Sequence, residues 1–290
     1  MIHPTPEAWL KAERKRVLVF GMSGLGKTRL SSLLRAGGGW FHYSVDYRIG
    51  TRYMDEHITD EFKRAAMRVP LLRDLLMSDS VYIASNITFD NLAPLSSYLG
   101  KPGDPERGGL PFAEYMRRQE QHRVAEISAL LDVPEFIGKA REIYQYPNFI
   151  CDSGGSICEV VDPHDPGDEV LTTLSAHTLM VWIEGGERHV AELARRFDRA
   201  PKPMYYEPDI LRAAWAEYLG ENGLAEAEVD PDAFVRWAFA RALAHRLPRY
   251  RAMAENWGIT ITAEEVAEVT DAAGFEALIA RALERRGREA

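Results

Sequence analysis

The segment Gly21-Met-Ser-Gly-Leu-Gly-Lys-Thr28 constrains the fold of this chain more than any other feature. The residues before it, Val17–Phe20, are all apolar, as in a buried parallel strand, and leucines follow it at helical spacing over 28–35. A glycine-rich loop between a strand and a helix can wrap backbone N–H groups around an anion, and the helix adds the positive end of its dipole. The segment therefore predicts a P-loop that binds a nucleoside triphosphate.

Each residue type in this loop has an expected role. Lys27 is expected to reach the β- and γ-phosphates, and the Thr28 hydroxyl to bind Mg²⁺. The alternative is a glycine-rich turn with a chance Lys-Thr, but the strand before it and the helix after it favour the P-loop. No Asn-Lys-x-Asp guanine signal is present, so ATP is the expected nucleotide. The residues expected to bind it are Gly21, Ser23, Gly24, Leu25, Gly26, Lys27, Thr28 and Arg29.

Strand and helix patterns alternate along the chain. This alternation predicts an α/β protein with a three-layer P-loop fold, in which a five-stranded parallel core sheet is covered by helices on both faces. A further short strand is expected over Val81–Ile87. The core strands are expected at 17–20, 40–45, 148–151, 178–183 and 257–262, and the main helices at 59–77, 112–131, 134–145, 188–197, 210–219, 231–247 and 274–286.

The expected organisation is a single P-loop kinase-like domain over 1–290. The stretch from about 55 to 145 is mostly helical and lies between two core strands, so it is interpreted as an insertion or cap. A lid is expected within about 188–245, where arginines follow the fourth strand. Kinase lids bring such arginines onto the transferring phosphate.

Two acidic residues follow core strands. In doubly wound sheets the ligand crevice lies outside the carboxyl ends of the strands, so Asp46 and Asp152 are both expected there. Asp152 could hold Mg²⁺ with Thr28, or it could cap the next turn. Asp46 could orient an acceptor hydroxyl for in-line attack, or it could cap the helical segment 47–54.

Arginines supply the remaining catalytic candidates. Arg48 and Arg52 are four residues apart and could clamp an anionic acceptor, although a solvated helix face explains them equally well. Arg195 is the lid candidate for stabilising the transition state, and a basic surface helix is its alternative. The other arginines of that segment are Arg188, Arg196 and Arg199.

The pattern resembles the shikimate kinase and nucleotide kinase branch of P-loop kinases. Besides the P-loop, the resemblance rests on Asp46 followed by Gly50-Thr-Arg52, which is similar to that family's acidic and arginine acceptor contacts. Asp152-Ser-Gly-Gly-Ser156 resembles its glycine triplet, although only two glycines are present. The segment Arg246–Ala254 resembles the Arg-x-x-x-Tyr-x-x-x-Ala helix that closes the nucleotide site. The spacing from Arg52 to Asp152 is much longer than in shikimate kinases, which makes shikimate a poor candidate for the acceptor.

Composition limits the partners. The formal net charge of −9 argues against nucleic acid, and no apolar run is long enough to span a membrane. Two cysteines, Cys151 and Cys158, are too few for a disulfide framework, which favours the cytoplasm. The expected function is an ATP- and Mg²⁺-dependent kinase acting on a small molecule. One alternative is a switch ATPase that binds a protein partner through the insertion, and another is a kinase that acts on a macromolecule. The sequence does not determine the oligomeric state.

Overall fold

The structure is a computed structural model that describes residues 2–289. The chain divides into two compact units. Unit 1 comprises Met1–Val45, Ile127–Pro201 and Arg236–Ala290, and unit 2 comprises Asp46–Glu126 and Lys202–Val235. The expectation of one domain with an insertion over about 55–145 and a lid over about 188–245 stays a prediction.

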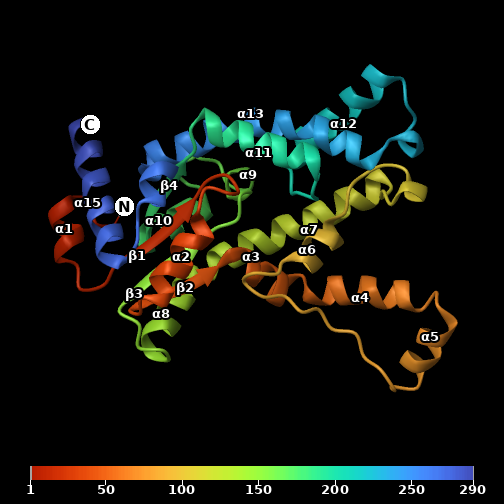
Figure 1. The fold of residues 1–290 in the computed structure, drawn as a ribbon, viewed down its shortest axis with the longest axis horizontal. Coiled ribbons are helices and arrows are strands. Elements are labelled where there is room, and N and C mark those ends of the chain that lie inside the picture. Colours follow the sequence, from red (N-terminus) through yellow and green to blue (C-terminus); the bar gives the residue numbers. More distant parts are fainter. Residues whose placement is uncertain (1, 290) are drawn as a thin grey trace. The chain divides into compact units, whose positions relative to one another are not determined.

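Unit 1 contains a five-stranded parallel sheet (Figure 1). The strand order is β2-β3-β1-β4-β5, which confirms the predicted α/β class and all five core strands. Residues 17–20 of β1 are fully buried, as expected of a central strand covered on both faces. The strands are β1 (Arg16–Phe20), β2 (Trp40–Ser44), β3 (Asn148–Asp152), β4 (Leu179–Glu184) and β5 (Gly258–Thr262).

Helices of unit 1 surround this sheet. α2 and α8 pack against β2 and β3, α10 packs against β4, and α15 packs against β5 and α1. On α13, the ring of Tyr250 lies 6.3 Å from that of Phe20 on β1. The helices are α1 (Pro6–Lys11), α2 (Lys27–Ala36), α8 (Val133–Glu142), α9 (Ile157–Val160), α10 (Glu169–His177), α11 (Glu187–Arg199), α13 (Pro231–Trp257, which starts in unit 2), α14 (Ala263–Ala267) and α15 (Ala272–Glu289).

The strand order places a switch point at β1. β1 pairs with β3 on one side and with β4 on the other, so the chain builds β2 and β3 on one side of β1 and then crosses to build β4 and β5 on the other side. A crevice forms outside the carboxyl end of the strand at such a point. The loop after β1 is the predicted P-loop, so the topology puts it where ligands bind.

The regular secondary structure of unit 2 is helical, apart from an isolated β-bridge between Pro102 and Leu110, and long loops connect its helices. Unit 2 contains a short π-helical segment, Ile49–Tyr53, directly after α3. Its helices are α3 (Val45–Arg48), α4 (Asp55–Ala66), α5 (Pro70–Met77), α6 (Ala93–Leu99), α7 (Phe112–Leu131, whose end lies in unit 1) and α12 (Pro208–Asn222), with 3₁₀ turns at Pro105–Arg107 and Glu226–Glu228.

Two sequence predictions for unit 2 are wrong. The helix expected over 59–77 is divided into α4 and α5, because Pro70 forces extended backbone on Val69 (φ −99°, ψ 114°). The strand expected over Val81–Ile87 does not form. Its β-branched residues have no neighbouring strand to pair with in the described chain, and Tyr82 at its start is 88% exposed.

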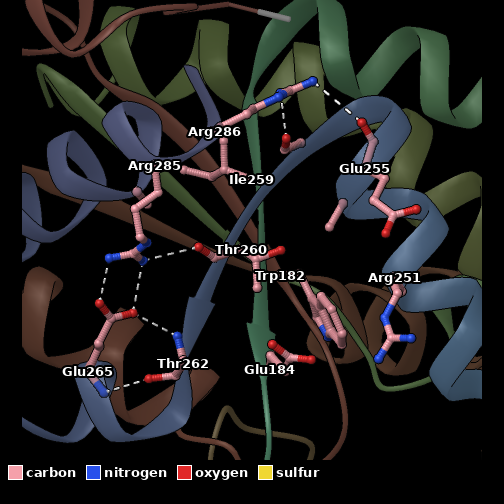
Figure 2. Close-up of a pocket in the computed structure, with 13 residues that line it drawn as sticks. Trp182, Glu184, Arg251, Glu255, Ile259, Thr260, Thr262, Glu265, Arg285 and Arg286 are labelled. Carbon is pink, nitrogen blue, oxygen red and sulfur yellow. Dashed lines mark hydrogen bonds and ion pairs between the residues drawn. The ribbon is translucent and has the colours of Figure 1, made fainter. Parts of the chain in front are cut away.

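The outer edge of β5 is covered by arginines of α15. Figure 2 shows Arg285 reaching both Glu265 and the Thr260 carbonyl oxygen, and Arg286 reaching the carbonyl oxygen of Glu255. Arg286 also donates to the Gly258 carbonyl oxygen. A pocket of about 780 Å³ lies along this edge, lined by residues of β4, β5, α13, α14 and α15. Uncovered strand edges pair with other chains, so these side chains protect the sheet from edge-to-edge association.

Replacing Arg285 and Arg286 together with alanine should increase self-association. The substitution exposes the Gly258 and Thr260 carbonyl oxygens and removes the surface ion pair of Arg285 with Glu265, which is worth about 1 kcal/mol or less. Light scattering over a range of protein concentrations measures the effect. A variant with alanine at Arg281 and Arg288 removes the same charge from the same helix and should remain like the wild type. Equal association of the two variants would contradict the proposed role.

No helix within residues 2–289 has both the length and the apolar character that crossing a bilayer requires.

Candidate phosphate-binding site

The loop after β1 has the backbone of a P-loop. Gly21, Gly24 and Gly26 have φ of 136°, 82° and 92°, in the region that favours glycine. At Gly21 a side chain is also excluded by space, because its Cβ would lie 2.6 Å from the Ile183 carbonyl oxygen on β4. The glycines therefore let the loop turn tightly against the neighbouring strand.

Lys27 is the first residue of α2, and its side chain folds back into the loop. Its buried Nζ donates hydrogen bonds to the carbonyl oxygens of Gly21, at 2.8 Å, and Met22, at 2.9 Å. These bonds hold a positive charge within the loop.

The N-terminus of α2 is available to an anion. Its first turn contains no acidic residue, and the N-cap Gly26 provides no side-chain hydrogen bond. The first N–H groups of a helix need partners, and together with the helix dipole they favour a phosphate. Thr28 is exposed in this turn, so its hydroxyl can reach a bound ligand. The residues present therefore fit a nucleotide with Mg²⁺.

The segment after β3 packs against the loop. The Ser153 hydroxyl donates to the Val19 carbonyl oxygen at 3.0 Å, and Gly155 lies close to the backbone nitrogen of Ser23, which would be 3.6 Å from a Cβ at Gly155. Asp152 is buried at the end of β3 and pairs in register with Val19. Its Oδ2 lies 3.7 Å from Nε2 of His42. Asp152 is thus on the strand beside the P-loop, and its Mg²⁺ role with Thr28 stays a prediction.

Buried side chains of α13 anchor the same segment. Arg246 forms an ion pair with Glu159, and the Tyr250 hydroxyl donates to the Gly155 carbonyl oxygen. Burial alone would lower the pKa of Arg246, but the carboxylate of Glu159 outweighs it and raises that pKa. Arg249 donates to the carbonyl oxygen of Cys158 at 2.6 Å. The helix that resembles the family's nucleotide-closing helix therefore fixes the backbone that borders the P-loop.

Both cysteines should be unreactive in the folded protein. Cys151 and Cys158 are not part of a disulfide and are fully buried, and burial raises the pKa of Cys158 to about 12. A thiol with a raised pKa stays protonated at neutral pH, and only the thiolate is nucleophilic. Labelling with a thiol-specific reagent should therefore be slow in buffer and complete for both cysteines in denaturant. Fast labelling of the native protein would contradict the buried environment.

α11 places an arginine over the loop. Its apolar face packs on α13, where the rings of Phe197 and Phe239 stack with centroids 4.0 Å apart. On the polar face, Nη1 of Arg196 lies 3.9 Å from the position that a Cβ on Gly24 would occupy. Arg195, the lid residue expected from the sequence, donates to Glu192. The spacing of the arginines in the sequence does not show which of Arg195 and Arg196 lies near the P-loop. The catalytic role of Arg195 stays a prediction.

The turn after β4 and the short helix α14 after β5 border the loop. A Cβ on Gly185 would lie 2.8 Å from Leu25, and one on Gly26 would lie 3.4 Å from Val266 of α14. Arg29 donates to the Val266 carbonyl oxygen at 3.4 Å. Val266 could not be identified from the sequence, because it belongs to no motif and only follows the last strand by a few residues.

The acceptor candidates Asp46 and Arg52 belong to unit 2. Asp46 is half-buried in the first turn of α3, and Arg52 is exposed in the π-helical segment. The guanidinium of Arg48 lies 5.5 Å from the ring centroid of Tyr53. Short π-helical segments occur frequently at functional sites, which is consistent with acceptor binding by this segment. The roles of Asp46, Arg48 and Arg52 stay predictions.

α7 carries a buried polar stripe that sequence reasoning missed. Gln119 is fully buried and holds the segment 204–206, donating to the Met204 carbonyl oxygen at 3.2 Å and accepting from the Tyr206 N–H at 2.9 Å. The ring of His122 stacks on Tyr205 with centroids 5.2 Å apart. In the sequence this stripe appears only as polar residues at helical spacing, a pattern that is also typical of a helix face exposed to solvent. Gln119 joins the two chain segments of unit 2.

No protein-family model and no curated protein sequence matches this chain. A crystal structure of shikimate kinase from Bacteroides thetaiotaomicron aligns with a TM-score of 0.36 and 16% sequence identity, covering 93% of this chain and 97% of that chain. A similarity this low carries no argument about activity. The parallel sheet with its switch point at β1, and the P-loop that follows β1, are the observations that define a P-loop α/β fold.

Proposed function

We propose that this protein binds ATP with Mg²⁺ at the P-loop and transfers the γ-phosphate to a small-molecule acceptor. The observation that carries the proposal is the loop itself, in which the Lys27 ammonium is held beside a helix N-terminus that lacks a side-chain cap. Arg196 adds a second positive charge near Gly24. A site with charges of this kind stabilises phosphates and the charge that develops during phosphoryl transfer.

In this proposal the chain's own residues bind and orient the nucleotide. Backbone N–H groups of the loop and of the first turn of α2 bind the phosphates, and Lys27 exchanges its carbonyl partners for phosphate oxygens. Thr28 and Asp152 would hold Mg²⁺, which supplies neutralising charge between the phosphates when it is bound.

Asp46 would orient the acceptor hydroxyl, and Arg52 with Arg48 would bind an anionic group of the acceptor.

A screen of metabolites as acceptors tests the proposal. The protein is incubated with Mg-ATP and single metabolites, chosen to include hydroxylated carboxylates and sugars, and both ADP formation and phosphorylated product are measured. One acceptor should accelerate ADP formation and appear with an added phosphoryl group. The proposal fails if no metabolite in a broad panel does both.

One observation favours a second candidate function, a switch ATPase with a protein partner. α5 of unit 2 contains no buried residue, and Leu71, Met77 and nearby Tyr82 are 69%, 74% and 88% exposed. Exposed apolar patches commonly mark interaction sites. This candidate expects slow hydrolysis that no acceptor accelerates, together with a complex that forms in only one nucleotide state. Acceptor-dependent product formation would exclude it as the main activity.

A further inference from the structure

The polar face of α11 contains a single acid among arginines. Glu192 lies four residues after Arg188 and three and four residues before Arg195 and Arg196, and Arg199 lies four residues after Arg195, so these residues share one face of the helix. The opposite face, with Val190, Ala194 and Phe197, packs against α13. Glu192 is thus the counter-ion in the middle of a basic surface.

Glu192 contacts two of these arginines in different ways. Its Oε1 accepts a hydrogen bond from Nε of Arg196 at 2.8 Å, and its Oε2 accepts one from Nη2 of Arg195. The hydrogen bond from Arg196 to Glu192 uses Nε. A different nitrogen of the same guanidinium, Nη1, is the atom near Gly24 of the P-loop.

This arrangement restricts a side chain that would otherwise be mobile. Arg196 is 64% exposed and packs little of its side chain, so it has many rotamers to sample. The hydrogen bond from Arg196, followed by that from Arg195, lowers the pKa of Glu192, so the carboxylate is charged at neutral pH. Without that charge the neighbouring arginines would repel one another.

We infer that Glu192 is a positioning residue that orients Arg196 over the P-loop, where the guanidinium meets the phosphoryl group in transfer. The inference rests on the proposed function, because it requires a nucleotide in the loop. It assigns Glu192 no contact with substrate. Its effect on the reaction passes through Arg196 alone.

Binding of ADP with aluminium fluoride, a mimic of the phosphoryl group in transfer, tests this role without a known acceptor. Glu192→Ala should weaken binding of ADP–aluminium fluoride by about fivefold, the upper end of what an exposed ion pair contributes, and leave the affinity for ADP alone unchanged. Glu192→Gln keeps an acceptor oxygen for Nε and should recover part of the loss. The effect of Glu192→Ala should also shrink as salt concentration rises.

A double-mutant cycle separates positioning from a general effect on the helix. Arg196→Ala should weaken binding of the mimic more than Glu192→Ala, and adding Glu192→Ala to it should change nothing further. The inference is overturned if Glu192→Ala leaves binding of the mimic unchanged, or if it weakens binding equally when Arg196 is absent. Glu284→Ala, which removes a comparable i,i+4 pair with Arg288 on α15, is the matched control and should bind like the wild type. If the wild type binds no nucleotide, it is the proposed function that fails.

Discussion

Replacing Lys27 with alanine should lower the rate of ATP turnover by about 100- to 1000-fold, the usual cost of removing a charge-stabilising donor from a phosphoryl- or acyl-transfer site. Among the described residues, Lys27 is the only one whose amine lies within the P-loop. This amine donates hydrogen bonds to the carbonyl oxygens of Gly21 and Met22. Nucleotide affinity should fall as well, because the lysine also meets the phosphates of bound ATP. Turnover is measured as ADP release, and affinity by isothermal titration calorimetry.

Arg35→Ala is the matched control for this variant. It removes a positive charge from the exposed far end of the same helix, α2, and should leave turnover near the wild-type value. Because Lys27 also forms two hydrogen bonds within the loop, circular dichroism and a thermal unfolding curve should accompany the assay. A folded Lys27→Ala protein with wild-type turnover would contradict the proposed site, and so would an equal loss in Arg35→Ala.

Replacing Glu159 with leucine should lower the free energy of unfolding by about 3–5 kcal/mol, because it leaves the buried guanidinium of Arg246 without its partner. The loss should appear in urea denaturation as a lower midpoint with an unchanged slope. The segment after β3 should also loosen, since Arg246 and Tyr250 anchor it beside the P-loop. Nucleotide affinity should therefore fall together with stability.

The double variant Glu159→Leu with Arg246→Met provides the decisive comparison. Replacing both charges with apolar side chains of similar size removes the buried unpaired ion, so most of the lost stability should return. The exposed pair of Glu284 and Arg288 is the reference, and breaking it should cost about 1 kcal/mol or less. If the double variant is as unstable as Glu159→Leu alone, the unpaired charge is not the cause.

The core of unit 1 was predictable from local patterns. β1 and β4 contain short apolar runs, over 17–20 and 179–183, that are followed closely by glycines, and such runs are typical of buried strands in an α/β chain. The P-loop is local as well, because its glycine φ angles and the start of α2 depend on adjacent residues. The segment Val81–Ile87 has comparable β-propensity and forms no strand, since a strand also needs a partner that no local pattern supplies.

The sequence by itself therefore determined the P-loop, the apolar runs that become the core strands, and the positions of Lys27 and Thr28, because these features arise from residues that are neighbours in the chain. Tertiary structure alone decided that Gln119 joins segments about 85 residues apart, that Glu159 pairs with Arg246, and that Arg196 is the arginine near Gly24. Such contacts depend on how helices rotate and pack on the sheet. The P-loop predicted at the outset is the site to which Arg196 and the segment after β3 are brought by that packing.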